Sequence, residues 1–218
     1  MLYERAVFSG DAGLLAEADR ELDAAEADQA LARGRLMHAR YLLRRDQVPD
    51  AIEEDPGELP LFERAARLYR ALGDVGHEAE ALFWVGCFHQ VVRHDNTAAV
   101  PVLEQSLELA SQASDKAVMS EALRHLGIAA HAAQRLETAR QHLEESTRLR
   151  REIGQSAGAA ANMVGLAYIA AAQHRGDDAL ALLDEADALA RAGQAPRIMQ
   201  QLSEARAELS GQRPQRLL

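Results

Sequence analysis

The feature that most constrains the fold is an internal repeat of about forty residues. Four segments of similar apolar pattern align with one another, and they begin at Glu58, Ala99, Ala139 and Ala179. A large apolar residue recurs in them at intervals of 40–41 residues, at Phe62, Leu103, Leu143 and Leu183. A fixed period of this length is typical of repeat proteins, in which each unit buries its apolar face against its neighbours.

The segments between these four also align with one another, and each contains a central glycine. These glycines are Gly34, Gly86, Gly127 and Gly165. The surrounding residues favour helix, so each repeat is predicted to be two helices, A and then B, joined by a short turn. A glycine inside a helix costs roughly 0.5–1 kcal/mol relative to alanine. We therefore expect helix A to approach its own helix B at the glycine, opposite small residues such as Ala139 and Ala179.

The segment from Glu121 to Leu149 resembles the tetratricopeptide repeat (TPR) family. Its Leu126-Gly127 in helix A, followed by Ala139, Leu143 and Ser146 in helix B, fits the family pattern without a gap. The period is longer than the standard 34 residues, and it is similar to that of the long-repeat variant in bacterial regulators and kinesin light chains. The resemblance implies an all-α, right-handed α-solenoid of antiparallel helix pairs.

The repeats predict a single domain over residues 1–218, with about four helix pairs. An N-terminal half-repeat and a C-terminal capping helix would complete it, and glycines at the ends of the B helices (Gly73, Gly154 and Gly193) would adopt the left-handed conformation. Between helices A and B of repeat 1, an acidic segment with two prolines predicts an exposed, mobile loop. The expected parts are an N-terminal helix at 11–27, repeat 1 at 28–73 with the loop at 46–58, repeats 2, 3 and 4 at 77–114, 116–154 and 156–193, the capping helix at 196–210 and a tail at 211–218.

Composition narrows the classes of function. The net charge of −10 disfavours direct binding to nucleic acid, because an acidic surface repels phosphate. A single cysteine excludes an intramolecular disulfide, and no apolar run is long enough to cross a membrane. We therefore expect a cytoplasmic protein with no nucleic-acid or membrane partner.

No motif in the chain predicts catalysis. A phosphate-binding glycine loop, a nucleophile elbow and a zinc-protease motif are all missing from the sequence. Cys87 and His89 lie two residues apart, and His125 and His131 lie six apart, so neither pair shares a helix face as metal ligands would. The Arg-Gly-Asp sequence at 175–177 is interpreted as a turn followed by a helix start. The sequence thus predicts no catalytic residue, no metal, no cofactor and no enzymatic activity.

The TPR resemblance places the A helices on a concave, partner-binding face. Counting from each helix-A glycine, the same positions recur on that face in every repeat. Arg124 would pair with a carboxylate there, and Asn162 would hydrogen-bond a peptide backbone. The predicted groove residues are Phe83, Trp84, Cys87, Arg124, His125, Ile128, His131, Asn162, Met163 and Leu166, and repeat 1 would add Leu31, Arg35 and His38.

Three functions remain open at this point. The first is a regulatory scaffold or adaptor that binds a protein or peptide in the groove. The second is a small-molecule or peptide sensor, or an enzyme, that uses the His, Arg and Asn residues of repeats 2–4. The third is self-association into a homo-oligomer through the ends of the solenoid.

Overall fold

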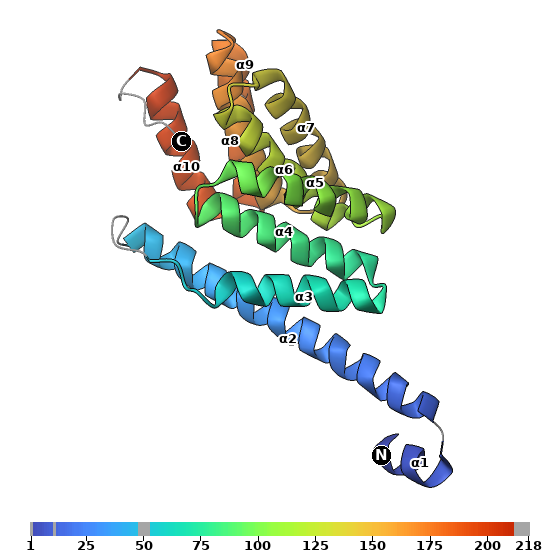
Figure 1. Cartoon of the computed structure of the whole chain (residues 1–218). Helices are drawn as coiled ribbons and strands as arrows, with labels where there is room; N and C mark the ends of the chain where they lie inside the picture. The colour runs from blue at the N-terminus through green and yellow to red at the C-terminus, as the bar shows by residue number, and fades with distance from the viewer. Residues whose placement is uncertain (1, 11, 48–52, 212–218) are drawn as a thin grey trace. The chain divides into compact units, whose positions relative to one another are not determined.

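The computed structural model describes residues 2–10, 12–47 and 53–211, which form helices joined by short turns (Figure 1). Ten helices and no strand occur within these ranges. The expected all-α fold of consecutively packed helices is therefore confirmed. None of the ten helices is both long and apolar enough to cross a membrane.

The chain divides into two compact units, Met1–Ala113 and Ser114–Leu218. In the first unit, each helix from α2 onwards packs against the next one along the chain, and α1 packs against α2. Buried aromatic and small side chains, among them Phe62, Ala65 and Phe88, form its main core. The helices of this unit are α1 (Leu2–Ser9), α2 (Ala12–Gln47), α3 (Glu58–Leu72), α4 (Val75–Val91) and α5 (Asn96–Gln112).

Helix α2 differs from the sequence expectation. The repeats predict a separate N-terminal helix at 11–27 and a first repeat beginning at residue 28, whereas one helix runs without a break over 36 residues. The residues around the expected boundary are mostly alanine, glutamate, glutamine, leucine and arginine, which favour helix, so no local signal ends it there. Helix α3 lies along the C-terminal part of α2, and the N-terminal part extends beyond it (Figure 1).

The second unit is also built from helices that pack against the next helix along the chain. Helix α6 packs against α7, α7 against α8, and α8 against α9, while α10 contacts both α8 and α9. Its core contains Leu143, Met163, Ile169, Leu183 and Leu202, all buried. The helices are α6 (Lys116–Ala132), α7 (Leu136–Glu152), α8 (Ser156–Ala172), α9 (Gly176–Ala192) and α10 (Pro196–Leu209).

The helix boundaries carry the period that the sequence predicts. Helices α5, α7 and α9 are B helices that start at Asn96, Leu136 and Gly176, which are 40 residues apart. Helix α10 begins 40 residues after α8 and has the position of an unpaired A helix. The repeated helix pair is therefore the structural unit of this chain.

At three of the four helix-A glycines, helix B lies too close to leave room for a Cβ atom. A Cβ built on Gly34 would lie 2.6 Å from a ring carbon of Phe62, and one on Gly86 would lie 2.6 Å from Leu103 Cγ. At Gly127 the corresponding distance to Leu143 Cγ is 2.9 Å. Each contact joins helix A to its own helix B, and alanines at the start of B helices, such as Ala139 and Ala179, are buried.

Gly165 differs from the other three. Its nearest neighbour is again Leu143, at 3.1 Å from a built Cβ, and this residue belongs to the preceding helix α7 rather than to α9. The expectation that Gly165 meets its own helix B is therefore corrected. The wider spacing also means that Gly165 is under less steric constraint than Gly86.

The turns between helices share one conformational device. Each turn from α3 onwards contains a residue with positive φ, and it is glycine only at Gly73 and Gly154. Gly193 was expected to be left-handed but has φ −84°, and its neighbour Gln194 has φ +48° instead. A Cβ at Gly193 would lie 3.2 Å from the backbone nitrogen of Ala157, a tight contact that favours glycine at this position.

Aspartate side chains cap the N-termini of helices α4, α5 and α6. Asp74 accepts a hydrogen bond from His77 N at the start of α4, and Asp95 accepts from Thr97 N and Ala98 N at the start of α5. Asp115 caps α6 in the same way. Such caps satisfy backbone donors that have no partner within the helix.

The predicted acidic loop at 46–58 is described only in part, because residues 48–52 lie outside the described ranges. Glu54 forms an ion pair with Arg93, with an Oε2–Nε distance of 2.9 Å. Glu58 was included in the exposed loop, but it is the first residue of α3 and is almost completely buried. Its carboxylate is paired with buried His38 on α2.

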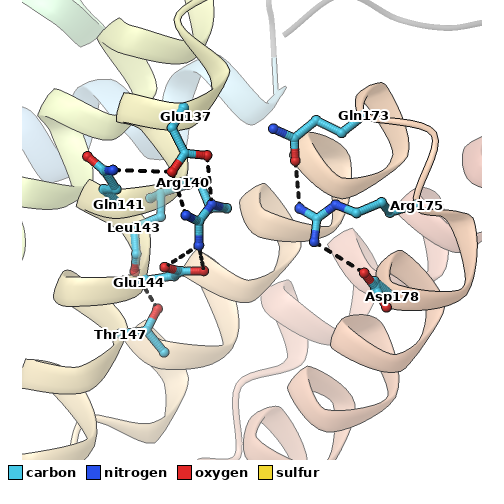
Figure 2. Close-up of polar contacts among 9 residues, drawn as sticks. All are labelled: Glu137, Arg140, Gln141, Leu143, Glu144, Thr147, Gln173, Arg175 and Asp178. Carbon is cyan, nitrogen blue, oxygen red and sulfur yellow. Dashed lines mark hydrogen bonds and ion pairs between the residues drawn. The ribbon is translucent and has the colours of Figure 1, made fainter.

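The surface of α7 is polar and internally paired. Figure 2 shows Arg140 held between Glu137 and Glu144 on the same helix, with Arg140 Nη1 2.7 Å from Glu144 Oε1. Ion pairs three or four residues apart, such as those of Arg140, stabilise a helix by only a few tenths of a kcal/mol. In the turn between α8 and α9, Arg175 donates to Gln173 Oε1 and to Asp178 Oδ2. The arginine of the Arg-Gly-Asp sequence is therefore engaged within its own turn.

Candidate functional site

The ten predicted groove residues fall into a buried and an accessible group. Five of them have exposed fractions between 0 and 7 %, so in this structure they form the interior rather than a binding surface. This corrects the prediction for Phe83, Cys87, Asn162, Met163 and Leu166. The accessible group consists of Trp84, Arg124, His125, Ile128 and His131.

Asn162 is buried because its amide completes a hydrogen-bond chain across three helices of the second unit. Ser146 Oγ donates to the carbonyl oxygen of Ser120 over 2.6 Å, and Asn162 Nδ2 donates to Ser146 Oγ over 2.8 Å. Arg124 Nη1 donates in turn to Asn162 Oδ1 over 2.8 Å. Both ends of the Asn162 amide are engaged, so this residue holds Arg124 in place instead of contacting a partner.

Helix α6 presents an accessible face over its second half. Arg124, Ile128 and His131 lie four and three residues apart, a spacing that places them on one side of a helix. Ile128 is 39 % exposed, while Arg124, His125 and His131 are partly exposed. We call Arg124, Ile128 and His131 the α6 face. It combines an anchored cation, an exposed apolar side chain and a titratable ring.

In the first unit, Trp84 is the accessible residue. Its ring stacks on Phe62 at 5.7 Å between centroids and meets His38 edge-on at 5.5 Å. The Arg35 guanidinium lies 5.6 Å from the Trp84 ring centroid, within the range of a cation–π contact. Arg35 also donates to Glu80 Oε1 over 2.9 Å. Trp84 is thus held between α2 and α3 while remaining partly exposed.

A buried polar chain, which the sequence pattern does not predict, lies against Trp84 through His38. His38 Nδ1 donates to Glu58 Oε1 over 2.7 Å, and the thiol of Cys87 lies 3.7 Å from His38 Nε2. All three side chains are buried. A histidine between a thiol and a carboxylate is also the order of a nucleophilic triad. Here all three side chains lie in the interior of the first unit, where they contact one another.

The electrostatics of the described residues indicate structural roles. Desolvation, followed by the hydrogen bond to Asp28, raises the pKa of Tyr69, and the same two causes with Glu208 raise that of Tyr168. Burial lowers the pKa of Arg150, which pairs with Glu121 at an Nη2–Oε2 distance of 2.6 Å. Within the described ranges, no three His, Cys, Asp or Glu side chains are grouped as metal ligands.

Comparison with known proteins finds similar chains among solved structures. No protein-family model and no curated protein sequence matches the chain. Among solved structures, the chain is similar to a substituted form of nearly identical TPR-like repeats from a putative kinesin light chain of Podosopora anserina. That match has a TM-score of 0.43 at 19 % identity and covers 88 % of this chain and 87 % of the other.

A second structure of nearly identical TPR-like repeats from the same organism gives a similar result. Its TM-score is 0.38 at 20 % identity, and the match covers 89 % of this chain and 97 % of the other. The description of the fold therefore rests on the repeated helix pair and the glycine contacts of this chain itself.

Proposed function

We propose that this chain is a non-enzymatic scaffold that binds a protein or peptide segment on the accessible faces of its A helices. The observation that carries the proposal is the α6 face, where an exposed isoleucine lies between an arginine and a histidine on one side of a helix. Arginine is enriched at protein interfaces, and the centre of an interface is more apolar than its rim.

The hydrogen bond from Arg124 to Asn162 supports this function. A guanidinium that is already held loses less conformational freedom when it binds a partner. Arginine pairs well with carboxylates, so the matching partner is a peptide with an acidic side chain or a C-terminal carboxylate. Ile128 lies about one helical turn from Arg124 on α6. An apolar side chain of the peptide at a similar distance from its carboxylate would therefore cover Ile128.

The experiment is selection of a phage-displayed random peptide library on the immobilised chain. Enriched peptides should share a carboxylate next to an apolar residue, and Ile128→Glu should reduce their binding by at least about tenfold, a change of 1.4 kcal/mol. Arg140→Ala is the matched control, because that arginine lies on α7 and is paired within its own helix. Enrichment of no peptide, or equal binding by the Ile128→Glu variant, would contradict the proposal.

The role of Arg124 is not tested cleanly by Arg124→Ala, because this change also removes a hydrogen-bond donor to buried Asn162. Arg124→Lys is the better variant, since lysine retains the charge but lacks the planar, bidentate donor group. We expect Arg124→Lys to weaken the binding of carboxylate peptides while the thermal unfolding midpoint changes little.

A further inference from the structure

Helix α2 carries an exposed stripe of leucines at intervals of seven residues. Leu15, Leu22, Leu36 and Leu43 are 47, 68, 59 and 57 % exposed. The remaining step of the series is Gln29, which is also exposed. From Leu15 to Leu43 the stripe spans 28 residue steps, or about 42 Å at the rise of an α-helix.

A second series lies three residues after the first and consists of alanines. Together the two series form the a and d positions of a heptad repeat, the pattern of a coiled-coil seam. Alanines 25, 32 and 39 are exposed, and Ala18 is half-buried. We call the two series the α2 seam: Leu15, Ala18, Leu22, Ala25, Gln29, Ala32, Leu36, Ala39 and Leu43.

From Leu22 to Leu43, the α2 seam lies on the side of α2 opposite to α3. The opposite side of α2 supplies Ala27, Gly34, His38 and Tyr41, which are all buried. Gly34 and His38 contact Phe62 and Glu58 on α3. Leucines repeated over such a length are unusual on a solvent-exposed face, and large apolar patches mark sites of association.

The charges of α2 are divided between its two halves. Residues 12–28 contain one arginine, Arg20, and six acids: Glu17, Asp19, Glu21, Asp23, Glu26 and Asp28. Residues 30–45 contain no acid and five arginines: Arg33, Arg35, Arg40, Arg44 and Arg45. Two copies of such a helix attract each other when they run in opposite directions and repel when they run in parallel.

We propose that a second copy of this chain covers the α2 seam in an antiparallel coiled coil. The sequence fits one register, in which every leucine from Leu22 onwards lies opposite an alanine of the second copy. Leu22 would face the second copy's Ala39, and Leu36 its Ala25, so that large and small side chains alternate. A two-fold axis near the middle of α2 makes the two halves of this interface identical.

The flanking charges favour the same register. Asp19 and Glu26 lie beside the seam on the side that also carries Arg33 and Arg40, so Asp19 approaches the second copy's Arg40. Glu26 already pairs with Arg64 of its own chain at 2.8 Å, an exposed contact of small energetic value. Asp19 and Arg40 are therefore the clearer pair to test. This interface lies outside the α6 face and goes beyond the proposed function.

The first experiment is sedimentation velocity on the full chain over a range of concentrations. We expect a monomer–dimer equilibrium that Leu22→Glu with Leu36→Glu shifts to monomer. Leu180→Glu is the matched control, because Leu180 is a 48 % exposed leucine on α9, and it should leave the equilibrium unchanged. Circular dichroism checks that the variants remain folded.

The second experiment is charge reversal, which tests the direction of the helices. Asp19→Arg alone and Arg40→Glu alone should each weaken the dimer, by about tenfold in Kd, because each creates two like-charge contacts. The double variant should recover the affinity, since it only exchanges the signs across the same contact. A monomeric wild-type chain, or a double variant no tighter than the single ones, would overturn the antiparallel dimer.

Discussion

His38 Nδ1 donates to Glu58 Oε1 over 2.7 Å, and this contact joins α2 to the first residue of α3 inside the core. It connects the two helices on either side of the acidic loop. Because a buried N–H without an acceptor is costly, the pair holds the start of α3 against α2.

Replacing Glu58 tests this role. We expect Glu58→Leu to lower the free energy of unfolding by about 1–3 kcal/mol, because His38 Nδ1–H then has no acceptor. Glu54→Leu is the control in the same loop, since Glu54 only pairs with Arg93 at the surface, and it should cost at most about 1 kcal/mol. Urea denaturation measures both, and equal losses would show that the buried contact contributes nothing specific.

The glycines inside A helices give a second prediction. Gly86→Ala should lower the free energy of unfolding by about 1–3 kcal/mol, because its Cβ would meet Leu103 Cγ at 2.6 Å and the leucine is enclosed. Gly165→Ala meets only a terminal methyl carbon of Leu143, at 3.1 Å, and gains up to about 1 kcal/mol of helix propensity. It should be neutral or stabilising. If thermal unfolding ranks the two variants the other way, the close-approach explanation fails.

The left-handed turn residues give a third prediction. Gln194→Gly should raise the free energy of unfolding by about 0.5–1 kcal/mol, since φ +48° strains a residue with a Cβ. Gly154→Ala should lower it by about 1 kcal/mol for the same reason, because Gly154 has φ +75° and a Cβ there meets open space. Differential scanning calorimetry of the two variants checks both signs. A destabilised Gln194→Gly variant would mean that side-chain contacts of Gln194 outweigh its backbone strain.

The sequence predicts the helical repeats well because each one leaves a local pattern. The glycines at 86 and 127 and the leucines at 103 and 143 recur at a constant interval, and their contacts follow from that interval. The boundary expected at residues 27–28 is absent from α2, because that expectation depends on aligning the repeats. The helix-favouring residues across that boundary let α2 continue, and a repeat alignment does not detect this.

The candidate site is less predictable because burial depends on side-chain partners that are distant in sequence. The repeat pattern gives Asn162 on α8 the position that Arg124 has on α6, three residues before the glycine. The amide of Asn162 is nevertheless buried, because it forms hydrogen bonds with Ser146 and Arg124. Glu58 is likewise classed as a loop acid until His38, twenty residues earlier, is seen beside it. The local signal for Glu58 is its position directly before the apolar residues 59–62 at the start of α3.

The last prediction concerns pH and His89 on α4. Burial, and next the charge of Arg93, lower the pKa of His89 below its ordinary value, and Glu54, Glu63 and Asp95 oppose the shift. Within the described contacts, the buried Nδ1 of His89 has no hydrogen-bond partner. As the pH falls through about 6.5, the unfolded chain takes up this proton before the folded chain does, so the free energy of unfolding decreases. The contribution is complete above about pH 6.5 and is lost progressively below it.

His89→Gln should therefore show a smaller loss of stability than the wild type between pH 7.5 and pH 5, with urea midpoints measured at several values in between. Carboxylates titrate in both proteins, so the difference between the two curves isolates the histidine. His77→Gln is the control, because His77 is largely exposed beside Asp74 at the start of the same helix. Parallel pH curves for the wild type and His89→Gln would mean that His89 is protonated equally in the folded and unfolded chains.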